Sequence, residues 1–97
     1  MGLSKEEVTK KLEKFPEWSF DEELEKVVTG FEFENFAEAV EFSNGIAQVA
    51  EDLGHHPDIF VHDYKFVSVF LSTHEEGITE KDFEFIEKLE ASMDKEE

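Results

Sequence analysis

The spacing of the apolar residues changes at Gly54, and this change limits the folds open to the chain. Over residues 36–53 the apolar side chains recur every three or four positions, which indicates an amphipathic helix. Over residues 65–72 they alternate, which indicates a strand. One strand face would carry Phe66, Ser68 and Phe70, and the other Val67, Val69 and Leu71. A helical period followed by a strand period predicts helices packed on a sheet.

Three polar residues mark the expected starts of helices. Ser4, with Glu7 three positions later, forms a capping box for a first helix that Pro16 would end. Asn35 caps the long helix at 36–53, which Gly54 would close. Its predicted apolar stripe is Phe36, Val40, Ser43, Ala47 and Ala50, widened by Ala39, Ile46 and Leu53. Thr79 caps a last helix whose apolar side would carry Phe83, Ile86, Leu89 and Met93.

The remaining segments predict strands and complete the fold class. Residues 18–33 suggest short extended pieces, interrupted at Gly30, and residues 59–61 form another strand. The short connection at 61–65 predicts a hairpin. We therefore expect one α+β domain over residues 1–97, a four-stranded antiparallel sheet with three helices on one face, in the order α-β-β-α-β-β-α. Its edge strands could pair with a second copy, so a homodimer or homotetramer is expected.

The charge of the chain excludes several classes of partner. The 97 residues include 26 acidic and 9 basic side chains, none of them Arg, and the formal net charge is −17. Such a surface repels phosphate backbones and anionic membranes, so neither nucleic acid nor a membrane is an expected partner. There is no Cys, which removes disulfides and thiolate chemistry. With no long apolar run and no signal-like N-terminus, we expect a cytoplasmic protein.

The histidines gather in one part of the chain. His55 and His56 lie between Gly54 and Pro57, and His74 follows Thr73. Neighbouring residues point apart in helices and strands, so two adjacent imidazoles converge on one ligand only from irregular backbone. Histidine titrates near neutral pH, and the cluster therefore indicates proton transfer or metal binding. A zinc site is the main alternative to proton transfer, because three histidines and a carboxylate could bind the ion, but the sequence has no His-x-x-x-His pair to favour it.

Taken together, these motifs resemble a known family. Glu51-x-x-x-His55-His56-Pro57, then Tyr64, His74 and Asp82 in this order, is similar to the signature of the pterin-4a-carbinolamine dehydratases. The likeness continues in Phe31-x-Phe33 before Asn35, and in Ser72-Thr73-His74 before Gly77-Ile78-Thr79. The segment between His74 and Asp82, residues 75–81, is shorter than is usual in the family.

The resemblance implies a lyase that dehydrates 4a-hydroxytetrahydropterins, in tetrahydrobiopterin recycling or biosynthesis, without a metal or organic cofactor. It implies acid/base roles for His55 and His74, and a substrate-binding role for His56. Glu51, one helical turn before His55, could hold an imidazole in one tautomer. Ser72 and Thr73 could offer polar contacts to the pterin. Asp82 is assigned to the same site, although the third position after the Thr79 cap also suits an acidic side chain.

Two other functions stay open at this point. Relatives of this family also serve as dimerisation or assembly modules without catalysis, and the same site could serve a molybdopterin-related pterin. The three histidines favour a catalytic role, because a non-catalytic assembly module does not require them. His62 is interpreted as a solvated residue of the hairpin and not as a fourth member of the site.

Overall fold

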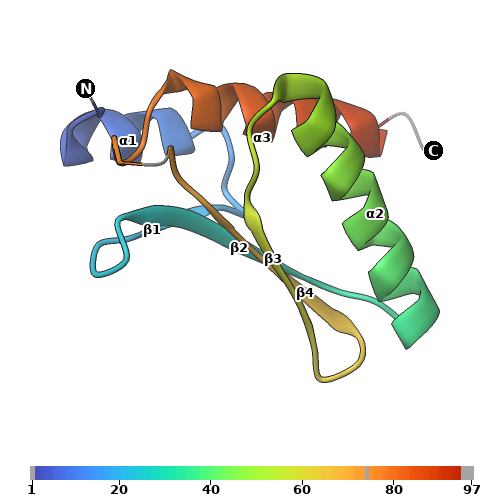
Figure 1. The fold of residues 1–97 in the computed structure, drawn as a ribbon. Helices are drawn as coiled ribbons and strands as arrows, with labels where there is room; N and C mark the ends of the chain where they lie inside the picture. Colours follow the sequence, from blue (N-terminus) through green and yellow to red (C-terminus); the bar gives the residue numbers. More distant parts are fainter. Residues whose placement is uncertain (1, 74, 95–97) are drawn as a thin grey trace.

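The computed structural model describes residues 2–73 and 75–94 and has the predicted order of elements. They are α1 (Lys5–Leu12), β1 (Ser19–Asp21), β2 (Lys26–Glu32), α2 (Phe36–Leu53), β3 (Asp58–His62), β4 (Phe66–Leu71) and α3 (Glu80–Asp94). The strands form one antiparallel sheet in the order β1-β2-β4-β3. All three helices lie on the same side of this sheet, and the opposite side is uncovered (Figure 1). The predicted α+β fold class is confirmed.

The central strand β4 has the two faces that alternation predicts. Val67, Val69 and Leu71 are fully buried under the helices. Phe66, Ser68 and Phe70 point to the uncovered side, which we call the open face, and are only partly buried. Gly30 does not interrupt β2, because it pairs with Ser68 in the middle of the β2–β4 ladder. The β3–β4 hairpin is also confirmed, and each strand begins or ends within one residue of its predicted position.

The starts of α1 and α2 and the end of α2 follow their predicted caps, whereas α1 ends at Leu12 and not at Pro16. The Ser4 hydroxyl accepts from the backbone N–H of Glu7, and the Glu7 carboxylate accepts from the backbone N–H of Ser4. In α2, Asn35 accepts from the backbone N–H of Glu38, and Gly54 ends the helix with φ 64° and ψ 32°. This left-handed conformation is the one that glycine adopts without steric cost. Among the described residues, no helix is both long and apolar enough to cross a membrane.

The buried face of α2 differs from the predicted stripe. Ala39, Ile46, Val49 and Ala50 are buried, whereas Phe36 at the start of the helix is 56% exposed. The buried side of α2 is therefore shifted around the helix axis from the predicted stripe that begins at Phe36. It packs against α3 as well as against β3 and β4. Small alanines on the contacting face allow this close approach, whereas Phe36, in the first turn, remains in solvent.

Candidate active site

The loop between α2 and β3 presents both histidines of the pair. Gly54 turns the chain out of the helix, and the backbone N–H of His55 still donates to Ala50 O at 3.1 Å. Residues 55–57 then have no regular structure before β3 begins at Asp58. His55 and His56 consequently point to different neighbours.

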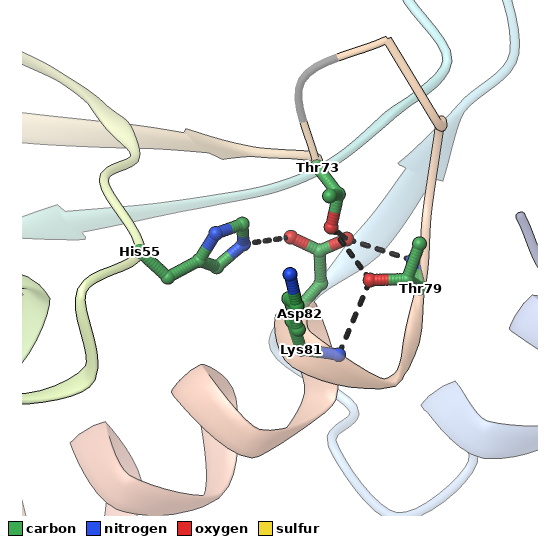
Figure 2. Close-up of polar contacts among 5 residues, drawn as sticks. All are labelled: His55, Thr73, Thr79, Lys81 and Asp82. Carbon is green, nitrogen blue, oxygen red and sulfur yellow. Dashed lines mark hydrogen bonds and ion pairs between the residues drawn. The ribbon is translucent and has the colours of Figure 1, made fainter.

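His55 points inward and meets the start of α3. Its Nε2 lies 2.6 Å from Oδ1 of Asp82, and only 11% of the His55 side chain is exposed (Figure 2). The Asp82 side chain is fully buried. A carboxylate accepts a hydrogen bond, so this contact favours the tautomer that carries its hydrogen on Nε2 and leaves Nδ1 as an acceptor. His55 is thus held in one orientation, with Nδ1 as its acceptor nitrogen in the favoured tautomer.

Asp82 is held in turn by the segment that precedes α3. Its Oδ2 accepts from the backbone N–H of Thr79 at 2.9 Å and from the Thr73 hydroxyl at 3.1 Å (Figure 2). The Thr73 and Thr79 hydroxyls lie 2.6 Å apart, and the Thr79 hydroxyl also accepts from the backbone N–H of Lys81. The capping role that the sequence suggests for Asp82 is present, and the same carboxylate also contacts His55. These contacts supply the partners that a buried carboxylate requires.

His56 has a different carboxylate and lies at the surface. Its Nε2 is 2.8 Å from Oε2 of Glu51, and the two side chains are 62% and 72% exposed. Glu51 therefore contacts the second histidine of the pair, although it lies one helical turn before the first. An exposed pair of this kind contributes little to stability, about 0–1 kcal/mol, and leaves His56 accessible to a ligand.

A hollow beside the histidines joins them to the open face of the sheet. Its volume is about 340 Å³, and its described lining residues are Lys26, Gly54, His55, His56, Asp58, Phe70 and Ser72. The volume is at the lower end of the range for small-molecule sites. A larger hollow of about 480 Å³ lies between α2 and α3, but no histidine is among its lining residues. We take the smaller hollow as the candidate site because it contains the residues that can transfer protons.

The other predicted site residues occupy two different environments. Ser72 lines the hollow, whereas Thr73 is buried and directs its hydroxyl to Asp82 and Thr79. His74 lies outside the described residues. Within residues 2–73 and 75–94, no group of three or more His, Cys, Asp or Glu side chains is placed to hold a metal ion. Lys26 and Asp58 were not predicted, because they join the hollow only through the order of the strands.

Comparisons with known proteins show the family of the chain. The sequence profile of the family described as Pterin 4 alpha carbinolamine dehydratase matches residues 1–92. The chain belongs to this family. A relative from Sulfolobus acidocaldarius, assigned by name to the pterin-4-alpha-carbinolamine dehydratases, is 42% identical over 90 residues, which cover 92% of this chain and 96% of the relative. One from a Picosynechococcus species, assigned to the same family, is 42% identical over 83 residues, covering 84% and 87%.

A solved structure shows the same dehydratase-family fold. The crystal structure of a transcriptional coactivator/pterin dehydratase from Brucella melitensis superposes with a TM-score of 0.83 at 34% sequence identity. The match covers 94% of this chain and 97% of that one.

Proposed function

We propose that this protein dehydrates 4a-hydroxytetrahydropterins to quinonoid dihydropterins and water. The observation that carries the proposal is the contact of 2.6 Å between His55 and the buried Asp82, at the wall of a hollow of small-molecule size. Membership of the dehydratase family supplies the substrate class. A buried carboxylate that orients an imidazole is an arrangement suited to acid/base catalysis.

The reaction needs two proton transfers. The C4a–O bond breaks while a proton is delivered to the departing hydroxyl, which leaves as water. The proton on N5 is removed, and its electron pair forms the C4a=N5 double bond of the product. Protons are balanced, because one is donated and one is accepted. General acid/base groups contribute roughly 10²–10⁴-fold to such a step.

His55 and His74 are the residues that we assign to these transfers. His55 has the environment described above, with Nε2 toward Asp82 and Nδ1 as the acceptor in the favoured tautomer. The role of His74 is inferred from its place in the family motif. Asp82 positions His55, and Thr73 positions Asp82 through its hydroxyl.

The remaining residues would bind the substrate. His56, held by Glu51 at 2.8 Å, lines the hollow from the loop. Ser72 and Phe70 line it from the end of β4, where a hydroxyl can hydrogen bond to the pterin and an aromatic ring can pack on its planar surface. No step of this reaction requires a redox change, which is consistent with catalysis by side chains alone.

The edge of the sheet supports an oligomer. β3 has a neighbour on one side only, so its other side offers unpaired backbone groups to a second copy. Phe60 on this strand is 54% exposed and packs edge-on against Phe70, so part of an aromatic pair is accessible to a second copy. We propose a homodimer or homotetramer. Sedimentation equilibrium tests this, and a monomer at micromolar concentration would contradict it.

A non-catalytic assembly role is the second candidate, because the Brucella melitensis protein is described as a transcriptional coactivator as well as a pterin dehydratase. The buried His55–Asp82 pair argues against such a role alone, because burying two ionisable groups is costly and assembly does not need them. The test is the ultraviolet-monitored loss of freshly generated 4a-hydroxytetrahydropterin. Acceleration by catalytic amounts of protein supports the dehydratase, and an unchanged rate with folded protein contradicts it.

A further inference from the structure

An ion pair crosses the open face of the sheet at the candidate site. Lys26 begins β2 and Asp58 begins β3, with β4 lying between these two strands. Neighbouring strands are about 4.8 Å apart, so the two side chains reach across a strand spacing of about 10 Å. Lys26 Nζ nevertheless lies 2.7 Å from Asp58 Oδ2. Both residues line the same hollow as His55 and His56.

Stability does not account for this arrangement. The side chains of Lys26 and Asp58 are 30% and 58% exposed, and ion pairs with such exposure contribute about 0–1 kcal/mol. Lys26 is the only Lys among the described lining residues, in a chain with 9 basic and 26 acidic side chains. An ammonium group has three donors, so the contact with Asp58 leaves Lys26 able to donate to a ligand.

We propose that Lys26 and Asp58 bind a hydroxylated substituent at C6 of the pterin ring. The inference rests on the proposed function, which brings N5 of the ring to the histidines. C6 is bonded to N5, so a substituent on C6 begins one atom from the reacting centre and remains within the same small hollow. Lys26 donates to a hydroxyl oxygen, and Asp58 accepts from a hydroxyl hydrogen. A donor beside an acceptor suits a diol, and a methyl group at C6 offers neither contact.

The test uses equilibrium binding, which does not depend on turnover. Calorimetry measures the Kd of two 7,8-dihydropterins, one with a dihydroxypropyl group at C6 and one with a methyl group. Lys26→Met removes the ammonium and keeps much of the stem, whereas Lys26→Arg keeps the charge and the donors. Lys65→Met is the matched control. Lys65 pairs with Glu32 at 3.0 Å and has 32% side-chain exposure, but it does not line the hollow.

Lys26→Met is expected to raise the Kd of the diol about tenfold and to change that of the methyl compound less than about twofold. Lys26→Arg should retain most of the affinity, and Lys65→Met should match the wild type with both compounds. Unchanged affinity of Lys26→Met for the methyl compound also shows that the variant is folded. Equal losses with the two compounds, no loss with either, or no binding of either by the wild type would overturn the inference.

The outcome for the dehydratase itself is separate. If the diol binds through Lys26 but the wild type does not accelerate dehydration, the proposed function fails and the Lys26 contact stands. If the wild type accelerates dehydration but Lys26→Met binds the diol as tightly as the wild type, the proposed function stands and the Lys26 contact fails.

Discussion

Nε2 of His55 lies 2.6 Å from Oδ1 of Asp82, although the two residues are 27 positions apart in the chain. This contact joins the loop after α2 to the first turn of α3. Asp82 has no exposed surface and also accepts from Thr73 and Thr79, so the carboxylate is held from three directions. The orientation of His55 is thus a property of the packed fold and not of the loop alone.

Replacement of Asp82 should show how much the orientation of His55 contributes to activity, because the imidazole itself is retained. Asp82→Asn keeps the volume but presents an amide in place of the carboxylate. We expect kcat to fall by at least about tenfold, because the favoured tautomer of His55 is no longer held. The free energy of unfolding should fall by about 1–3 kcal/mol, since buried hydrogen bonds are lost.

The matched control for this change is Asp63→Asn. Asp63 also contacts a histidine, His62 at 3.0 Å, but both side chains are exposed and neither lines the hollow. Its kcat should equal that of the wild type. Comparable losses of kcat in the two variants would show that the buried contact has no special role.

Gly54 should matter through its backbone conformation. Its φ of 64° strains any residue with a Cβ, although no atom lies within 4 Å of the Cβ position. Gly54→Ala should therefore lower the free energy of unfolding by about 1–2 kcal/mol. It should also lower kcat, because the next residue is His55. Chemical denaturation and steady-state kinetics measure the two effects.

Gly45→Ala is the control for Gly54→Ala. Gly45 lies inside α2, and a Cβ there also meets nothing within 4 Å. Alanine is the better helix former, so stability should rise by about 0.5–1 kcal/mol with no change in kcat. A stabilised Gly54→Ala variant would contradict the account of the loop.

The capping box of α1 should make stability depend on pH. The backbone N–H of Ser4, and then its hydroxyl contact, lower the pKa of Glu7 below its ordinary value of 4.5. A lowered folded-state pKa means that the stabilisation is complete above pH 4.5 and is lost as the pH falls through the folded pKa. Urea unfolding of wild type and Glu7→Gln should therefore differ at neutral pH and converge in acid. A constant difference across this range would be evidence against the box.

Local signals in the sequence were enough to predict much of the fold. Ser4 with Glu7, and Gly54 after an amphipathic run, each depend on contacts within a few residues, and both are present. The face of α2 was less predictable, because Ala39, Ile46 and Val49 form an apolar side that overlaps the stripe beginning at Phe36. Only the neighbouring α3 and the sheet determine which side is buried.

The sequence named His55, His56, Glu51 and Asp82 as candidates, but it did not indicate which carboxylate contacts which imidazole. Glu51 lies one helical turn before His55, and proximity along the chain made it a natural partner, yet it contacts His56. The partner of His55 is Asp82, which reaches it only when α3 packs beside the loop. Lys26 reaches Asp58 across β4, and spacing in the sequence does not specify the strand order that places the two residues there.

The most direct test of the central claim is the rate of dehydration with His55→Ala/His74→Ala and with His62→Ala. His62 is the matched control, because it contacts Asp63 on the exposed hairpin. We predict that the wild type and His62→Ala accelerate the ultraviolet-monitored loss of 4a-hydroxytetrahydropterin equally. The double variant should lose at least about 10²-fold of this acceleration while remaining folded. Full activity in the folded double variant would contradict histidine catalysis at this site.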